Sequence, residues 1–588
     1  MRFLSFGLIT SIFATFSIAY VAAADNDIQR AMKDELVRSM DKLSVESLQR
    51  PYYMDYRLTL RKARSIKSTL GSLLYSRNNR SALLTVGVRV GSPEFDNTNF
   101  FDVGLGFFGS ADDEETFRGR RLTFEPDYAS LRRELWLASD AAYKQSAEIY
   151  AKKESAVKNR LRTDTTPDFK LLPPAEIEDT VSIPDFDVSH FEQLSNDLSA
   201  VFLRYPRVSA SAVSIEYLPK TVYFVNSEGR GFHKNEFYAG IEAVASSQAA
   251  DGMPLAETYS CYTRDPRNFP SRDSLLHAVE AIAKTLNALL DAPTLPEAYS
   301  GPILFEEQAA AELFAQVFAP NLVTQRPPLT ERGIQDQERY FAFQNKIGGR
   351  VLPEFLSLTA EPDRATFGQT YVLGNYSTDD DGIAAQRVTL VYQGYLKTLL
   401  SSRIPTKRIR QSNGHQRGGA AMISTLILSS ESKKQADRAG LKKRMMKLCK
   451  DRELPFGIII RKALNQNILY TLLYEQTAGE YPFAQGETKM SVLETVKLYP
   501  DGREELIRGV EAAGLTPQSF KDIILVGKKQ FCYNYLAPAV TSPFISGGDQ
   551  YTGATIIVPD ILFEDGELRP LESDFPKPPF IVSPLGEK

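Results

Sequence analysis

The sequence predicts an α+β protein with a mixed α/β N-terminal half and a β-rich C-terminal half. Up to about residue 290, amphipathic segments of helical period alternate with strand-like segments. After residue 302, most of the chain consists of short strand-like runs separated by Gly- and Asp-rich turns. Because 588 residues are too many for one ordinary hydrophobic core, we expect two domains, 25–297 and 298–588.

The first 24 residues have the pattern of a secretory signal peptide. Arg2 precedes an apolar run from about Phe3 to Val21, and the small residues 22–24 follow it. An N-terminal membrane anchor is the alternative, because the run is near the lower length limit for a span. We expect cleavage after Ala24. The mature chain would then be exported, periplasmic or extracellular, with no membrane span after signal cleavage.

Hydrophobic periodicity predicts the elements of the N-terminal half. Residues 25–50 place Met32, Leu36, Met40 and Leu43 on one helical stripe. The other helices are expected over 130–160, 188–204 and 273–290. Strands are expected over 52–62 and 81–91, and four more within 209–249, with a hairpin turn at 226–229. The proline- and acid-rich stretch 168–187 should be extended, and 291–302, with three prolines, should be a linker.

In the C-terminal half, two helices are expected among the strands. One covers 306–318, and its first turn would contain Glu306 and Glu307. The other is the strongly charged segment 429–452.

Overall charge argues against some binding functions, although local charged patches remain possible, and cysteine content adds little. The net charge of -4 gives no global attraction to nucleic acid or to an anionic membrane. Cys261, Cys449 and Cys532 are an odd number of cysteines, so at most one intramolecular disulfide can form. No CxxC pair or cluster with zinc-finger spacing is present in the sequence.

Five stretches, in order along the chain, resemble the TldD/PmbA family, also written TldD/TldE. "VYFVNSEGRGFH" resembles the strand–NSEG–strand hairpin of its N-terminal domain. "SGPILFEEQAAAELF" stands where the metallopeptidase members carry their metal-binding helix. The other three are "YSTDDDGIAAQRVTLVYQGYLKTLLSSR" (376–403), "RQSNGHQRGG" (410–419) followed by "AMISTLIL", and "YPDGREELIRGVEAAGL" (499–515). The resemblance covers most of the mature chain, and its weight rests on the shared order of the five.

The resemblance implies a two-domain subunit that dimerises. In the family, the active type of subunit carries an HExxxH helix and a downstream cysteine that together bind zinc. The other type lacks the histidines and serves as its partner. The family's activities include proteolysis of short or unfolded peptides and maturation of a peptide antibiotic.

Aligned by its flanks, this chain is a degenerate member that lacks the HExxxH histidines. Phe305 and Ala310 occupy the two histidine positions, and neither side chain offers a lone pair to zinc. Glu306 occupies the glutamate position. Without a metal, a lone glutamate is a poor peptidase. The structural alternative for Glu306 is an acid placed at a helix start by the helix dipole.

The remaining candidates come from the glycine-rich and acidic segments. His415 is the best functional candidate among the four histidines, as a contact for a peptide backbone; His190 and His277 are expected to be exposed and structural, respectively, and His233 is ambiguous. Cys532 lies loosely where active members place the third zinc ligand, but a lone strand cysteine is most often a buried apolar residue. The candidate peptide-contacting residues are Asp380, Gly382, Gly414, His415 and Arg417.

Two charged segments have competing interpretations. The run 379–382 is interpreted as a tight acidic turn, because the distal glutamate of a calcium loop is absent. The basic cluster Lys407, Arg408, Arg410 and Arg417 either binds phosphate or a peptide carboxylate, or is a solvated surface loop. We do not expect it to bind nucleic acid, because no aromatic residues are interleaved.

These observations favour an exported TldD/PmbA-family protein that is a non-catalytic peptide-binding or partner subunit of a metallopeptidase complex, a pseudoenzyme. Its partner would be an HExxxH-bearing TldD-type subunit, or a second copy in a homodimer, and its ligand an unfolded or extended peptide. We expect no cofactor in this chain, with zinc in a partner subunit. Two alternatives stay open. One is a metallopeptidase with a rearranged zinc site formed by Glu306, His415 and Cys532; the other is a homodimeric structural or interaction scaffold.

Overall fold

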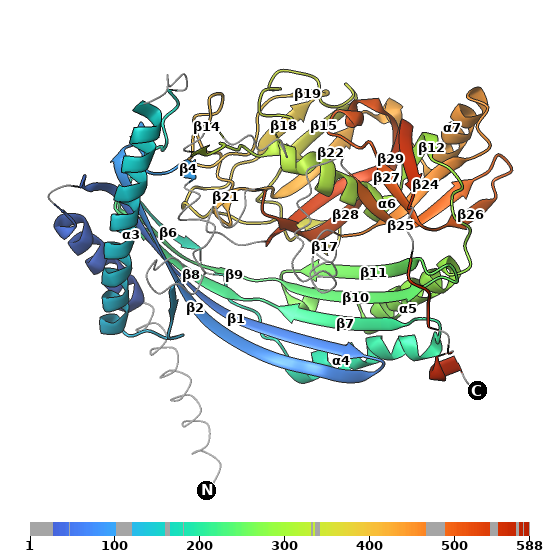
Figure 1. Ribbon diagram of the computed structural model, residues 1–588, viewed down its shortest axis with the longest axis horizontal. Helices are drawn as coiled ribbons and strands as arrows, with labels where there is room; N and C mark the ends of the chain where they lie inside the picture. The colour runs from blue at the N-terminus through green and yellow to red at the C-terminus, as the bar shows by residue number, and fades with distance from the viewer. Residues whose placement is uncertain are drawn as a thin grey trace, which may run out of the picture.

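The computed structural model describes most of the chain. It covers residues 27–45, 48–101, 120–158, 165–179, 181–330, 333–334, 341–465, 489–540, 551–571, 575–579, 581 and 583–586. The expected signal peptide, residues 1–24, lies outside the described residues and stays a prediction. Figure 1 shows a long curved N-terminal sheet below and the strands of the C-terminal half above it.

A ten-stranded sheet forms the N-terminal half. Its strands are β1 (Pro51–Thr69), β2 (Ser72–Ser92), β3 (Phe95–Asp96), β5 (Arg120–Leu122), β6 (Ala175–Asp179), β7 (Ala210–Tyr217), β8 (Lys220–Asn226), β9 (Arg230–Glu236), β10 (Ala239–Gln248) and β11 (Pro254–Thr263). The main order is β11-β10-β7-β1-β8-β9-β6, and β2 pairs antiparallel with β1. The four strands expected within 209–249 are confirmed as β7 to β10. The described part of the stretch 168–187 is extended, as expected, and it includes β6, which pairs parallel with β9.

Helices cover one face of this sheet and one of its ends (Figure 1). They are a helix over 27–42, α3 (Tyr128–Lys158), α4 (Val188–Ala200) and α5 (Arg272–Leu289). α4 and α5 pack against β7 and β10 around a core that includes Leu198, Ile241 and Leu286. The opposite face of the sheet meets the C-terminal half, where Tyr262 packs with Leu373 and Leu536.

A twelve-stranded sheet forms the C-terminal half, as the β-rich prediction requires. Its strands are β12 (Tyr299–Phe305), β15 (Leu356–Ala360), β18 (Val388–Tyr392), β19 (Tyr395–Leu396), β22 (Thr425–Ser430), β23 (Gln435–Ala436), β24 (Gly457–Ala463), β25 (Met490–Leu498), β26 (Glu504–Ile507), β27 (Val510–Ala513), β28 (Ile523–Pro538) and β29 (Tyr551–Pro570). Because β12 pairs with both β24 and β29, the pairings β12-β24-β25-β27-β29 close into a ring.

Short strand pairs complete the described structure. They are β4 (Phe100–Phe101), β13 (Leu329–Thr330), β14 (Gly333–Ile334), β16 (Thr366–Phe367), β17 (Thr370–Tyr371), β20 (Gln416–Arg417) and β21 (Ala420–Ala421). β13 pairs with β4, so one small sheet contains strands from both halves of the chain. The α+β class is confirmed. The expected domain boundary between residues 297 and 298 stays a prediction.

The two expected C-terminal helices are present, with different starts. α6 spans Glu307–Leu313 and continues as a π-helical turn, Phe314–Phe318. α7 spans Arg438–Asp451, so the expected start at residue 429 is wrong. Asp437 caps α7 by accepting a hydrogen bond from the Gly440 amide, and the residues before it form β23, which pairs with β28. Within the described ranges, none of the helices combines the length and apolar character that a membrane span needs.

Candidate functional site

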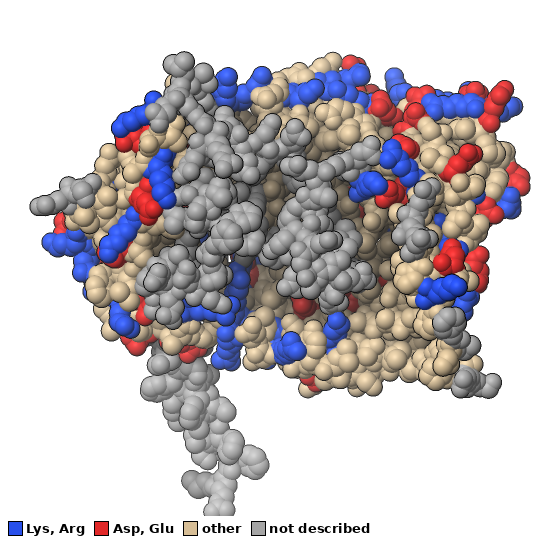
Figure 2. Space-filling view, in the orientation of Figure 1, with Lys and Arg blue, Asp and Glu red and all other residues tan. Residues whose placement is uncertain are grey.

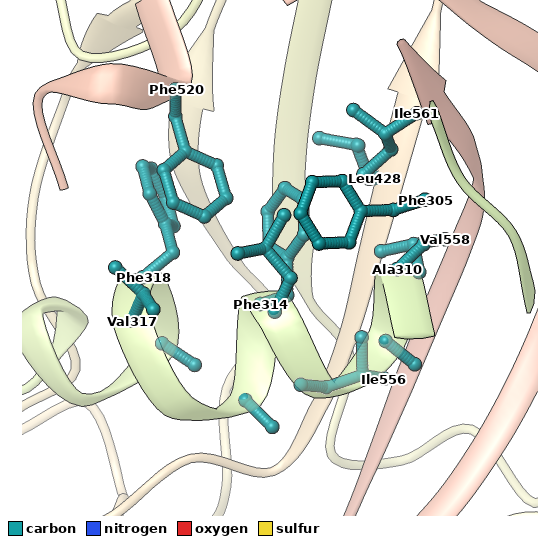
Figure 3. Packing of buried hydrophobic residues seen from close by; sticks show 14 of the residues in the cluster. Phe305, Ala310, Phe314, Val317, Phe318, Leu428, Phe520, Ile556, Val558 and Ile561 are labelled. Atoms are coloured by element: carbon teal, nitrogen blue, oxygen red, sulfur yellow. The ribbon is translucent and has the colours of Figure 1, made fainter. Parts of the chain in front are cut away.

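The two positions aligned with metal-binding histidines lie inside the C-terminal hydrophobic core. Phe305 ends β12 and is 1% exposed, and Ala310 on α6 is fully buried. The rings of Phe305 and Phe563 meet edge to face, with 5.7 Å between their centroids. Figure 3 shows Phe305 and Ala310 among other apolar side chains, including Phe314 and Ile561. Zinc needs nitrogen, sulfur or oxygen ligands. The residues at these positions therefore do not fit the metal that the family resemblance implies.

Glu306 does not lie in the first turn of the helix, as expected, but just before it. Its amide donates to the Ile460 carbonyl at 2.9 Å, which extends the β12–β24 pairing by one residue. The next residue, Glu307, has φ +40° and turns the chain sharply into α6. Strand pairing therefore keeps Glu306 extended, and the helix begins one residue later than expected.

Arginines surround the Glu306 carboxylate. It is 4% exposed, with its oxygens 3.4 Å from Arg438 Nε and 3.3 Å from Arg461 Nε. Burial raises its pKa, while the charges of Arg438 and Arg461 oppose the shift. Arg438 also pairs with Asp560, which accepts a hydrogen bond from the Glu307 amide. These contacts are those of a structural ion-pair cluster that fixes the β12–α6 junction.

The third candidate ligand, Cys532, lies on β28 opposite Ile557 of β29. Burial raises the pKa of its thiol to about 11, which disfavours the thiolate that a metal requires. In the described part of the chain, no three His, Cys, Asp or Glu side chains are grouped so that they could hold a metal ion. Glu306, His415 and Cys532 are thus not brought together. None of the three cysteines forms a disulfide.

A cavity of about 1050 Å³ lies between the two halves instead. Residues of β1, β2, β8 and β9 form one wall. The other wall comes from segments of the C-terminal half and includes residues within 373–381 and 416–421 and the start of β29. The cavity therefore exists only while the two halves are packed together. Of the candidate peptide-contacting residues, Asp380 and Arg417 line it, and Gly382, Gly414 and His415 do not.

Asp380 joins the two halves at this cavity. Lys234 of β9 donates to its carboxylate at 2.8 Å, and Arg57 of β1 donates to its backbone carbonyl at 2.5 Å. Its second carboxylate oxygen accepts from the Gly418 amide at 2.8 Å. Burial acts to raise the pKa of Asp380, but the charges of Lys234 and Arg57 outweigh it, so the pKa is lowered. The carboxylate is ionised and fully partnered.

The buried Asp379 holds the acidic turn together through hydrogen bonds to backbone amides. Its carboxylate accepts hydrogen bonds from the amides of Asp381, Ile383 and Gln416 at 2.8 to 3.1 Å. Burial and the neighbouring Asp381 raise its pKa to about 8 despite these bonds. The run 379–382 is thus a tight turn, as expected, and it is bonded to the segment around Gln416 rather than open to a cation.

His415 has a structural position in the adjoining segment. It is fully buried, and its Nδ1 lies 3.0 Å from both the backbone and the side-chain oxygen of Asn413. Burial lowers its pKa to about 4. Gly414 beside it has φ +75°, and a Cβ there would meet the Ala384 carbonyl at 2.4 Å. In this buried position, away from the cavity lining, His415 offers no exposed surface for the expected contact with a peptide backbone.

A second buried ion pair, between Arg403 and Glu228, also joins the two halves. Arg403 donates to Glu228 at 2.7 and 2.8 Å and to the Lys170 carbonyl at 2.8 Å. Glu228 belongs to the NSEG turn between β8 and β9, where Asn226 also binds it. Two of the sequence motifs, about 175 residues apart, therefore meet in space.

Sequence reasoning missed Arg57, Lys234, Glu228 and Arg403. β9 contained a usable signal. Phe232, Lys234 and Glu236 are spaced two residues apart, so their side chains lie on the same face of the strand. Charged residues on the buried face of a strand need partners. The partners, however, come from the other half and no local pattern identifies them. Lys407, Arg408 and Arg410 are exposed and do not line the cavity.

Restoring the motif should not restore a metal site. In Phe305→His/Ala310→His, two polar rings would enter a packed apolar core, so we expect the free energy of unfolding to fall by about 3 kcal/mol or more. Elemental analysis should find no stoichiometric zinc in the purified variant. Lys447→His, at an exposed position of α7, is the control and should change stability by less than about 0.5 kcal/mol. One zinc per chain with unchanged stability would contradict this account.

The buried His415 should make stability depend on pH. Because the pKa of His415 is about 4 in the folded state and about 6.5 when unfolded, the unfolded chain binds the extra proton first. Its contribution is therefore present above pH 6.5 and is lost as pH falls toward 4, by up to about 3 kcal/mol. Urea unfolding of wild type and His415→Gln between pH 7.5 and 4 measures the difference. Parallel curves would contradict the buried neutral histidine. His190→Gln, at an exposed position, is the control.

Comparisons with known proteins agree with the sequence and the fold. Residues 298–566 match the PmbA/TldA metallopeptidase C-terminal domain. The fold is similar to that of a candidate modulator of a DNA gyrase from Thermotoga maritima, with TM-score 0.55 and 13% identity over 88% of this chain and 96% of that chain. It is also similar to TldE from Thermococcus kodakarensis, with TM-score 0.55 and 12% identity over 92% and 100% of the two chains.

A third similar structure is a candidate modulator of DNA gyrase from Bacteroides thetaiotaomicron, with TM-score 0.54 and 10% identity over 92% of this chain and 99% of that chain. No curated protein matches the chain. At these identities the solved structures establish the fold, and the match over 298–566 assigns the C-terminal half to the PmbA/TldA metallopeptidase C-terminal domain. Together, these findings support the assignment of the chain to the TldD/PmbA family.

Proposed function

We propose that this protein is a non-catalytic, peptide-binding partner subunit of a metallopeptidase complex. The observation that carries the proposal is the placement of Phe305 and Ala310 in the closed apolar core, where active members would hold zinc. A charged cavity of about 1050 Å³ lies elsewhere, between the two halves. The chain thus combines a closed motif position with a separate site for a ligand.

The surroundings of Glu306 support a non-catalytic role. A general base needs access to water or to the substrate proton. Glu306 is 4% exposed, lies against Arg438 and Arg461, and does not line the cavity. Its charge is used to hold the β12–α6 junction.

The lining of the cavity supports an extended peptide as the ligand. Its walls contain backbone segments, charged groups and aromatic residues, and the aromatic residues include Phe224 and Tyr376. Extended peptides bind sheet edges and grooves mainly through main-chain hydrogen bonds, with little demand on sequence. Such a ligand suits a subunit that presents unfolded chains to a catalytic partner.

The proposed partner is a TldD-type subunit that carries an intact HExxxH motif. The similar structure named TldE and the lost histidines both support a chain that works beside such a subunit. We propose further that the mature protein is exported after cleavage behind Ala24. N-terminal sequencing of the secreted or periplasmic protein tests this cleavage directly.

Coexpression tests the central proposal. The protein alone should contain no stoichiometric zinc and should not cleave an unfolded substrate. The complex with the HExxxH-bearing subunit should contain zinc and cleave, and changing that subunit's motif glutamate to Gln should abolish cleavage. Phe305→Leu in this chain keeps the core apolar and should leave the activity of the pair unchanged.

Zinc and cleavage by this protein alone would overturn the proposal. Copurification as a homodimer that binds no peptidase subunit and no peptide would favour the scaffold alternative.

A further inference from the structure

The lining of the cavity between the two halves is richer in cations than in anions. Eight basic side chains line it, against four acidic ones. The basic residues are Arg57, Arg61, Arg89, Lys220, Lys234, Arg264, Arg326 and Arg417. The acidic residues are Asp55, Glu236, Asp380 and Asp381. The whole chain, in contrast, has a net charge of -4. On the face shown in Figure 2, basic and acidic side chains are intermixed.

Two of the acidic side chains of the cavity are paired with lysines, and burial disfavours the ionised form of the other two. Glu236 accepts from Lys220 and Lys234 at 2.8 and 2.7 Å, and Asp380 is bound by Lys234. Burial raises the pKa of Asp55 and Asp381. Added negative charge in the cavity would therefore meet little repulsion. Five of the eight cations already pair with carboxylates, however: Arg57, Lys220 and Lys234 with Asp380 or Glu236, Arg89 with Asp96, and Arg326 with Asp168.

Arg417 is the cation best placed to receive that charge. It is half-buried, lines the cavity, and lies over the Tyr376 ring with 4.5 Å between its guanidinium carbon and the ring centroid. Its Nη1 donates to the Gly553 and Ile423 carbonyls at 2.9 and 3.5 Å. Among the described residues, no carboxylate lies within 4.0 Å of it, and its Nε and Nη2 groups donate no hydrogen bond.

These contacts hold the guanidinium in place. Its charge helps to lower the pKa of the buried Glu236, but the two groups form no ion pair within 4.0 Å. Arginine binds carboxylates through two parallel N–H groups, and this fork is costly to bury without an anionic partner. Stacking on Tyr376 and the bond to Gly553 fix the plane of the group in advance. Less side-chain entropy is then lost when a carboxylate binds.

We infer that the cavity binds peptide through one of the peptide's own carboxylates, and that Arg417 pairs with that carboxylate. This inference rests on the proposed peptide-binding function and specifies its ligand class as an anionic extended peptide. The carboxylate comes from the peptide C-terminus or from an acidic side chain. Arg264, bonded to Asn375 next to Tyr376, adds positive charge to the same region.

Fluorescence anisotropy with four labelled ten-residue peptides of one unfolded sequence tests the inference. The peptides have a free or an amidated C-terminus, combined with Glu or Gln at one internal position. Wild type should bind the doubly neutral peptide about 10- to 100-fold more weakly than the best charged one, as expected for a hydrogen-bonded ion pair. The two singly charged peptides show which carboxylate is recognised.

Two variants locate the contact. Arg417→Gln should remove the preference for the charged peptide. Arg410→Gln, at an exposed arginine seven residues away that does not line the cavity, should keep it. Thermal unfolding confirms that each variant is folded, and the comparison of peptides on wild type needs no variant.

The outcomes separate the inference from the proposed function. Equal binding of charged and neutral peptides would overturn the carboxylate inference and leave peptide binding intact. A charge preference that survives in Arg417→Gln would overturn the role of Arg417. Failure of every peptide to bind wild type would overturn the inference and the proposed peptide-binding function together.

Discussion

The ion pair between Lys234 and Asp380 connects the two halves of the molecule and shapes the space between them. Lys234 comes from a strand of the N-terminal sheet, and Asp380 from an acidic turn of the C-terminal half. Asp379 holds that turn through three backbone amides, and Gly418 ties it to the hairpin that carries Arg417. Removing one partner of a buried pair leaves an uncompensated charge, which is strongly destabilising. This contact therefore helps to hold the walls of the cavity together, as does the second buried pair, Arg403 with Glu228.

The positions aligned with the family's metal-binding histidines, Phe305 and Ala310, are part of the packed core. If two ligands were replaced in an open site, an unfilled polar cleft would remain. Here, β12 and α6 are instead packed against aromatic and aliphatic residues. Phe305 against Phe563, and Phe314 against Phe520, fill the region around the former motif. Dense packing of this kind makes polar insertions costly. The residues at this position therefore contribute to the packing of the core, and the charged cavity lies elsewhere, between the two halves.

The sequence predicted much of the fold and part of the site. Hydrophobic periodicity located β7 to β10 and the long helix α3, because each buries a regular face. It failed at Glu306, where pairing with β24 keeps the chain extended, and at the start of α7, where β23 pairs with β28. The acidic turn at Asp380 was recognised by its composition. Its partners Arg57 and Lys234 were not, because the pairs join positions 146 and 323 residues apart.

Hydrogen–deuterium exchange, with and without an excess of unfolded anionic peptide, tests the central claim most directly. The account predicts added protection in the peptides that cover β8 and β9, the turn around Asp380 and the hairpin around Arg417. Exchange across β12 and α6 should stay unchanged. Protection confined to β12 and α6, with none around Asp380 or Arg417, would contradict the claim that the cavity between the halves is the binding site.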